Sequence, residues 1–315
     1  MTLHDLVTLP DLPSTFTKVV TQIETFVLLE FDSQIAQNQL YYHNRAHINS
    51  VRRRANDISN TVLQYCNIDD ITRMRLLLDL CAIAHDMIQV FVPQTDIHTT
   101  RRRESGVSES LTFEKLSNYI KNLNQQLKEH GLEDAVFSDA DISIIKNAID
   151  ATVCHYDPSD QSIYQPAIYE NKDLSLVALI IALADINSLG MEGIDIYNQE
   201  GSLLFLEENP DVISLIKNQS IKNLAVDNRS LAENIRQRLV KRARFQVNFA
   251  KSRLMRFRNE IARFPSEAIP VLVNETFRYL NAETVQEVES STPTDEDTSL
   301  EDLMAFFQLD KYAAV

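Results

Sequence analysis

The amino-acid sequence predicts an all-α fold, and three observations support that prediction. Only 5 Gly and 9 Pro occur among the 315 residues, so few positions are suited to tight turns. Apolar residues recur mainly at helical spacing along the chain. Turn signals between these apolar segments are rare. A β-sandwich and a Rossmann-type sheet with a glycine-rich phosphate loop are therefore disfavoured, and long helices are expected.

The expected helices follow one another along the chain. The first covers about 14–30 and follows Pro13, because proline favours a helix start. The second covers about 45–63 and presents one apolar face. The third covers about 70–87 and is apolar almost all round from Leu76 to Ala84, which places it in the centre of the core. Further helices are expected at about 105–129, 139–154, 172–189, 229–263 and 266–280.

Charge is distributed unevenly along the chain. The formal net charge of −15 argues against nucleic acid or an anionic membrane as a partner of the whole protein. The helix expected at 229–263 nevertheless carries eleven Lys or Arg against two Glu, a local charge of +9. Residues 283–315 carry nine Asp or Glu against one Lys, a local charge of −8. The basic helix could bind an anionic partner, but a solvated face opposed by acidic neighbours is the favoured interpretation.

The chain is expected to be cytoplasmic. Its three cysteines, Cys66, Cys81 and Cys154, are scattered and odd in number, which is typical of reduced thiols in a cytosolic protein. The N-terminus shows neither the basic region nor the apolar stretch of a signal peptide. The longest purely apolar run, Leu176–Ala184, is too short to span a bilayer.

Histidine and aspartate stand at several expected helix ends. His43 and His47 are four residues apart at a helix start, so both can face one cavity. His85-Asp86 ends the most apolar helix, and Asp185 follows a continuous apolar stretch, where a buried carboxylate is costly unless it is paired or binds a metal. Taken singly, each of these residues, and His155 beyond a later helix, has an ordinary structural explanation. Together they predict a divalent metal site, because imidazole nitrogens and carboxylate oxygens suit such ions.

The ordered pattern of His, His-Asp and Asp resembles the HD superfamily of metal-dependent phosphohydrolases, whose fold is all-helical. The resemblance implies that the metal ligands are His47, His85, Asp86 and Asp185. The run Tyr42-His43-Asn44-Arg45-Ala46-His47 is similar to the Tyr-His-Asn-x-x-His motif of class I cyclic nucleotide phosphodiesterases, in which the residue matching His43 is the general acid. Ala184-Asp185-Ile186 is likewise similar to the Ala-Asp-Leu of those enzymes.

A closer resemblance, over roughly residues 38–192, is to the bacterial group of predicted metal-dependent HD phosphohydrolases. Two departures concern the third motif: Arg103 stands where that group has Asn, and Ser105 directly follows Glu104. The implied fold is an HD-type, phosphodiesterase-like helical bundle with additional C-terminal helices. The segments that match motifs of this group are 43–48, 85–86, 103–106, 152–155 and 185–190.

Four segments are then expected along the chain. The apolar residues of the last segment, between Leu300 and Leu309, must dock on the chain's own body or on a partner. The segments are an N-terminal helix packed on the core (1–37), an HD-type catalytic core (38–192), a helical extension with the basic helix (193–282), and an acidic linker with a short amphipathic tail (283–315).

The resemblance also implies roles for individual residues. One or two divalent ions (Mn, Mg, Fe, Zn, Co or Ni) would activate a water that attacks phosphorus, and Asp86 could bridge them. Protonated His43 could donate to the leaving oxygen, and Glu104 could orient the water. The run Arg101-Arg102-Arg103 could clamp the phosphate or lie in a solvated loop. His155 could contact the substrate or the second ion.

The expected activity is hydrolysis of a small phosphate ester, with a nucleotide as the favoured substrate. The Tyr-His-Asn match favours a cyclic nucleotide diester, and a 5′-nucleotide monoester is the alternative. Phe91 and Gln89 are near enough in sequence to hold a base. A different class of function also stays open: a regulatory HD protein that binds metal or nucleotide without turnover and uses its basic helix and tail to bind a partner. A homo-oligomer is compatible with either hypothesis.

Overall fold

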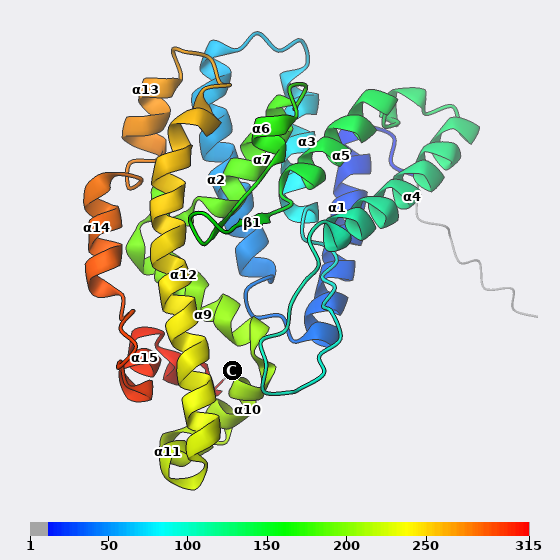
Figure 1. The fold of residues 1–315 in the computed structure, drawn as a ribbon. Coiled ribbons are helices and arrows are strands. Elements are labelled where there is room, and N and C mark those ends of the chain that lie inside the picture. Colours follow the sequence, from blue (N-terminus) through cyan, green and yellow to red (C-terminus); the bar gives the residue numbers. More distant parts are fainter. Residues whose placement is uncertain (1–11, 315) are drawn as a thin grey trace, which may run out of the picture.

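The computed structural model describes residues 12–314, and this part of the chain is built almost entirely of helices, which confirms the all-α prediction (Figure 1). The N-terminal residues in which no targeting signal is expected lie outside the described part. The longer helices are α1 (Phe16–Asn38), α2 (Arg45–Val62), α3 (Ile71–Ala84), α4 (Val107–Glu129), α5 (Asp139–Ala151), α7 (Leu176–Ile186), α9 (Ile194–Glu208), α10 (Pro210–Lys217), α12 (Arg229–Ile261) and α14 (Ala282–Ser291). The shorter ones are α6 (Ala167–Glu170), α8 (Ser188–Glu192), α11 (Leu224–Asp227), α13 (Ile269–Val271) and α15 (Leu300–Phe306).

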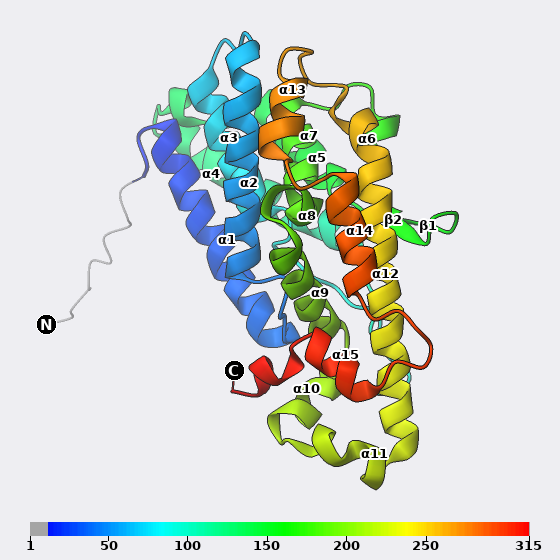
Figure 2. The same ribbon diagram turned by 90° about the vertical axis from the view of Figure 1, so that its left-hand side faces the viewer.

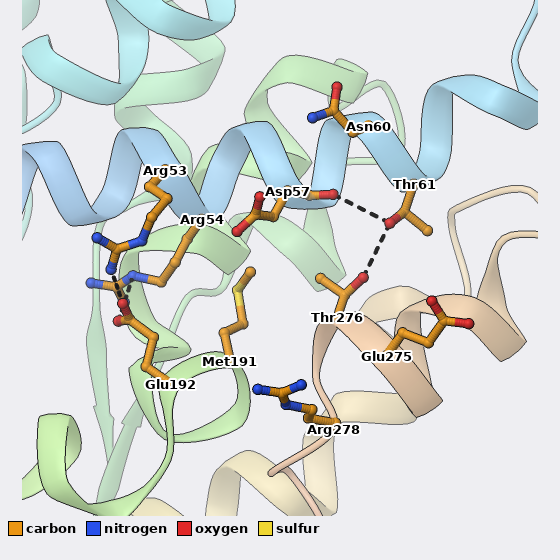
Figure 3. Close-up of a pocket in the computed structure, with 10 residues that line it drawn as sticks. All are labelled: Arg53, Arg54, Asp57, Asn60, Thr61, Met191, Glu192, Glu275, Thr276 and Arg278. Carbon is orange, nitrogen blue, oxygen red and sulfur yellow. Dashed lines mark hydrogen bonds and ion pairs between the residues drawn. The ribbon is translucent and has the colours of Figure 1, made fainter.

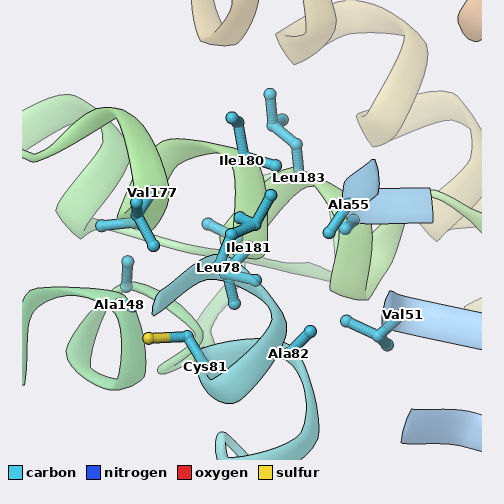
Figure 4. Packing of buried hydrophobic residues seen from close by; sticks show 14 of the residues in the cluster. Val51, Ala55, Leu78, Cys81, Ala82, Ala148, Val177, Ile180, Ile181 and Leu183 are labelled. Carbon is cyan, nitrogen blue, oxygen red and sulfur yellow. The ribbon is translucent and has the colours of Figure 1, made fainter. Parts of the chain in front are cut away.

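Helices α3 and α7 form the centre of the main apolar core. α3 packs against α1 and α2, and α7 packs against α2 and α5. Every residue of α7 from Val177 to Ala184 is buried, as its uninterrupted apolar sequence requires. Figure 4 shows side chains of α2, α3, α5 and α7 meeting in this core. The ends of these packed helices consequently lie close together.

Several elements differ from the sequence-based expectations. Three helices, α9, α10 and α11, occupy the part of the expected helical extension before the basic helix, for which the sequence predicts no individual helices. A two-stranded antiparallel hairpin, β1 (His155–Asp157) and β2 (Ser162–Tyr164), pairs Tyr156 with Ile163. The helix expected at 266–280 is limited to α13 and a π-helical turn at Leu272–Thr276. Proline close to the start of α13 limits how far a helix can extend toward the N-terminus there.

The C-terminal third of the chain has an apolar core of its own, which we call the C-terminal cluster. It joins α9, α10 and α12 to the amphipathic tail, and the tail therefore docks on the chain's own body. Within the segment expected as an acidic linker, helix α14 forms at its start, and only the stretch between α14 and α15 is extended (Figure 2). The residues of the cluster are Phe205, Leu206, Val212, Ile213, Ile216, Ile221, Leu224, Ala232, Ile235, Leu239, Val240, Ala243, Leu303, Phe307 and Leu309.

Acidic groups of the same chain face much of the basic helix α12. Arg244 pairs with Glu296 of the tail at 2.8 Å, and Lys251 pairs with Glu289 of α14 at 2.5 Å. Figure 2 shows α14 lying along α12, with α15 near the lower half of that helix. These contacts agree with the favoured interpretation of the basic helix as a face opposed by acidic neighbours. Among residues 12–314, no helix is both long enough and apolar enough to cross a membrane.

A buried ion pair lies within α12, near the C-terminal end of the helix. Arg253 and Glu260 are almost fully buried, with Arg253 Nη1 donating to Glu260 Oε1 at 2.6 Å. Tyr169 also donates its hydroxyl to Glu260 Oε1, at 2.7 Å. The Tyr169 hydrogen bond therefore links the C-terminal end of α12 to α6.

We expect Glu260→Gln to lower the free energy of unfolding by about 3–5 kcal/mol, because it leaves the buried Arg253 charge without its partner. Urea unfolding measures the change. Lys146→Met is the control, since the exposed Lys146–Asp150 pair should contribute no more than about 1 kcal/mol. Equal losses in the two variants would contradict the structural role of the buried pair.

Candidate metal centre

Three helix ends meet beside the main core, and each carries residues singled out in the sequence. α2 begins just before His47, and its N-cap Asn44 accepts a hydrogen bond from the His47 amide at 3.1 Å. α3 ends immediately before His85-Asp86, and α7 ends one residue after Asp185. The mutual packing of these helices brings the predicted ligands together although they are far apart in sequence.

One ligand atom from each of His47, His85, Asp86 and Asp185 lies within 4.8 Å of all the others. His47 Nε2 is 3.1 Å from Asp86 Oδ2 and 3.6 Å from Asp185 Oδ1. His85 Nε2 is 3.0 Å from Asp86 Oδ2 and 3.6 Å from Asp185 Oδ1. Both imidazoles are buried, whereas the two carboxylates keep 13% and 15% of their side-chain exposure. The cluster thus opens to solvent on its carboxylate side.

The arrangement of the cluster fits a divalent cation. Ligand atoms about 2.1 Å from an ion and at right angles to one another lie about 3.0 Å apart, close to the separations found here. His85 Nε2 is buried and has no hydrogen-bond partner among the described residues, although Asp86 Oδ2 is only 3.0 Å away. Two imidazoles and two carboxylates also form the mixed nitrogen and oxygen donor set of divalent transition metals. These four residues could therefore hold a metal ion.

Hydrogen bonds outside the cluster orient its members. His85 Nδ1 donates to the carbonyl oxygen of Ala82 at 2.9 Å, so in the neutral ring the lone pair is on Nε2, facing the carboxylates. Gln89 donates its amide to Asp86 Oδ1 at 3.0 Å. Gln165 likewise donates its side-chain amide to Asp185 Oδ2, at 3.4 Å. Each glutamine contacts the carboxylate oxygen that does not face the histidines.

The backbone of Asp185 is also held in place. Arg54 of α2 is buried and donates Nη1 to the Asp185 carbonyl oxygen at 3.2 Å, while Nη2 pairs with Glu200 of α9 at 3.1 Å. Figure 3 shows Arg53 and Arg54 converging on Glu192 of α8. The surface cavity of about 380 Å³ beside these residues contains none of the candidate ligands.

Burial and charge set the protonation of the cluster. Burial lowers the pKa of His47 despite the neighbouring Asp86, which favours the neutral ring that binds metal. Burial alone would raise the pKa of Asp86, but His85 and His43 outweigh it and hold that pKa well below its ordinary range. Burial alone would lower the pKa of His85, but Asp86 and Asp185 raise it well above its usual value. A metal ion would therefore displace a proton from His85 on binding.

His43 lies beside the cluster and is anchored by Glu207 of α9. His43 Nε2 is 3.7 Å from Asp86 Oδ2, and its Nδ1 is 2.5 Å from Glu207 Oε1. Glu207 Oε2 accepts hydrogen bonds from the amides of Tyr41, Tyr42 and His43 at 2.9–3.1 Å. Glu207 is completely buried, which by itself would raise its pKa, yet His43 and Arg103 lower that pKa to about 2. The carboxylate is therefore ionised and fixes the ring of His43.

Glu207 is a site residue that the sequence-based expectations miss. A signal for it is present, because Glu207 directly follows the apolar run 203–206, just as Asp185 follows its own apolar stretch. It lies in the helical extension expected to be separate from the catalytic core, so that extension takes part in the candidate site.

The three consecutive arginines have different environments. Arg103 Nη1 is 2.9 Å from His43 Nε2 and 2.5 Å from Gln89 Oε1. Arg101 instead donates to the backbone carbonyls of Glu207 and Asn38, and its guanidinium lies over the Phe91 ring at 3.8 Å. Arg102 is exposed. Arg103 alone of the three contacts the residues around the candidate ligands, and Arg101 serves to hold the chain in place.

Two further expected site residues lie apart from the cluster. Glu104 and His155 are both exposed, and neither makes a hydrogen bond or ion pair with the candidate ligands among the described residues. Glu109, in the first turn of α4, has a pKa that is raised above its ordinary value. Burial, and to a lesser extent Asp86, raises its pKa.

Comparisons with known proteins do not assign the chain to a family: no family model, no curated protein and no solved structure matches it. The case for a metal site therefore depends on the residues themselves, namely the converging donors of His47, His85, Asp86 and Asp185.

Replacing Gln89 by Leu should weaken Mn²⁺ binding about 10- to 100-fold, because the amide that holds Asp86 Oδ1 is lost. Isothermal titration calorimetry measures the affinity. His155→Ala is the control and should bind Mn²⁺ like the wild type. If Gln89→Leu binds as tightly as the wild type, the orienting role of Gln89 is wrong.

Glu207 should also give the protein an acid-sensitive component of stability. Its pKa is about 2 when folded and near its ordinary value of 4.5 when unfolded, so this stabilisation is present above pH 4.5 and is lost as the pH falls toward 2. Between pH 5 and pH 3 the loss should be about 2 kcal/mol. Urea unfolding of the wild type and of Glu207→Gln at both pH values isolates this component, which should be missing in the variant. Equal acid sensitivity of the two proteins would refute it.

Proposed function

We propose that the chain is a metal-dependent phosphohydrolase that hydrolyses a small phosphate ester, with a nucleotide as the favoured substrate. The observation that carries the proposal is the convergence of His47, His85, Asp86 and Asp185 next to a fifth polar residue, His43, that is not a candidate ligand. A divalent ion held by the four residues would polarise a phosphoryl oxygen and make water a better nucleophile. His43 would then donate a proton to the leaving group.

The contacts of His43 support a proton-transfer role. Because the guanidinium of Arg103 can only donate, His43 Nε2 accepts from it, and the ring proton is on Nδ1, directed at Glu207. A buried carboxylate on Nδ1 stabilises a positively charged ring, as in a catalytic triad. His43 can therefore take a second proton at Nε2, on the side that faces Asp86. A proton at this position can be passed to a leaving oxygen.

Arg103 fits the recognition of a phosphate. Its guanidinium contacts the imidazole of His43 and the amide oxygen of Gln89, both weaker partners than an anion. A bound phosphate group would compete successfully for it and would free His43 Nε2. The binding of a substrate phosphate to Arg103 would thus also release His43 from its contact with Arg103. Arg101 and Arg102 have no such role here, because Arg101 is engaged with carbonyl groups and Arg102 is exposed.

A regulatory protein without turnover is the second candidate, and one observation favours it. Arg103 blocks the Nε2 side of His43, so a chain in which this contact never opens could bind metal and a phosphorylated ligand without hydrolysing it. An enzyme would hydrolyse a bound phosphate ester, whereas a regulatory protein would only bind it. Hydrolysis measurements distinguish the two candidate functions.

The test uses the Mn²⁺-loaded protein with 3′,5′-cyclic nucleotides, 5′-nucleotides and nitrophenyl phosphate mono- and diesters. We expect release of phosphate or of the monoester product from at least one class. Asp185→Asn should abolish it, and His43→Gln should reduce kcat by about 10²- to 10⁴-fold while Mn²⁺ still binds. A Mn²⁺-replete wild type that is inert toward the whole panel would overturn the proposal and favour the regulatory candidate.

A further inference from the structure

The last turn of α9 faces two environments at once. Glu207 reaches His43 and the amides of residues 41–43. The two preceding residues, Phe205 and Leu206, are buried in the C-terminal cluster instead. Because successive side chains on a helix point about 100° apart, the packing of Phe205 and Leu206 sets the direction of Glu207.

The C-terminal tail completes the packing around this turn. Leu303 and Phe307 are fully buried in the C-terminal cluster, and the Phe307 ring stacks on Phe205 with 6.1 Å between centroids. Tyr41, whose amide donates to Glu207, packs against the same cluster. The tail therefore supports the two chain segments that meet at Glu207.

The connector that leads to the tail is fixed on α12. Arg236 donates to the carbonyl oxygens of Glu296 and Thr298 at 2.5 and 3.2 Å. Arg244 donates to the carbonyl oxygen of Thr294 at 2.9 Å and pairs with the Glu296 carboxylate. These contacts fix the connector on α12, next to the place where α15 packs on the C-terminal cluster.

We propose that the tail, through Leu303 and Phe307, positions Glu207 and thereby His43. The proposal rests on the proposed function only for the role of His43. The metal ligands border the main core, which is a separate apolar cluster. The tail should therefore control the orientation of His43 and leave the metal site intact.

Hydrogen exchange of the full-length protein, without metal or substrate, tests the proposal. Phe307→Ala should speed exchange of the amides of Tyr41, Tyr42 and His43 by about 10-fold or more, because their acceptor Glu207 becomes mobile. Exchange in α3 and α7 should stay unchanged, and Mn²⁺ should bind as in the wild type. Phe307→Leu, which keeps an apolar side chain, should restore most of the protection.

The control is Met255→Ala, which removes a large side chain that is 63% exposed on α12 and should change none of these values. Wild-type protection at residues 41–43 in Phe307→Ala would overturn the proposal. So would faster exchange spread evenly over α3 and α7, since that is general destabilisation. Because exchange needs no turnover, these outcomes are decided separately from whether the chain hydrolyses phosphate esters. If it does, Phe307→Ala should lower kcat and leave KM unchanged.

Discussion

Two carboxylates at buried helix ends are the constraint on which the rest of the structure depends. α7 and the second half of α3 are largely apolar, yet α7 carries Asp185 in its last turn and α3 is followed by His85 and Asp86. Two ionised carboxylates this close together in a largely buried site are costly unless positive charge or a metal compensates them. The imidazoles of His47 and His85, the amide of Gln89 and the backbone contact of Arg54 all serve these two groups. A divalent ion is the partner that would satisfy both carboxylates and both imidazoles together.

The candidate site draws on both apolar clusters of the chain. The main core supplies the candidate ligands, whereas Glu207, which orients His43, comes from a helix of the C-terminal cluster. The charged residues are likewise distributed unevenly along the chain. The strongly negative net charge conceals a basic helix and an acidic tail that contact each other within the chain. These contacts fix the connector between α14 and α15 on α12, and apolar packing holds the tail on the cluster.

The sequence predicts the all-α fold and the convergence of the four candidate ligands, for a local reason. Helical periodicity and an acid at the end of an apolar run are visible in one stretch of sequence, as at Asp185. Contacts between distant segments are not visible in this way. The pairing of His43 with Glu207, and the separation of Arg103 from Arg101, arise only when α9 packs beside residues 38–43. Motif spacing also predicts Glu104 and His155 as site residues, but the turn and the hairpin that carry them leave both exposed. Membership in the HD superfamily stays a proposal.

The most direct test of the central claim is the metal content of the purified protein after dialysis against Mn²⁺ and removal of free ions. We expect about one equivalent or more in the wild type, and less than about a tenth of an equivalent in a His85→Ala, Asp86→Asn double variant that is still folded. Circular dichroism establishes the fold of the variant. A wild type that retains less than about a tenth of an equivalent, or a variant that retains as much as the wild type, would contradict a metal centre at these four residues.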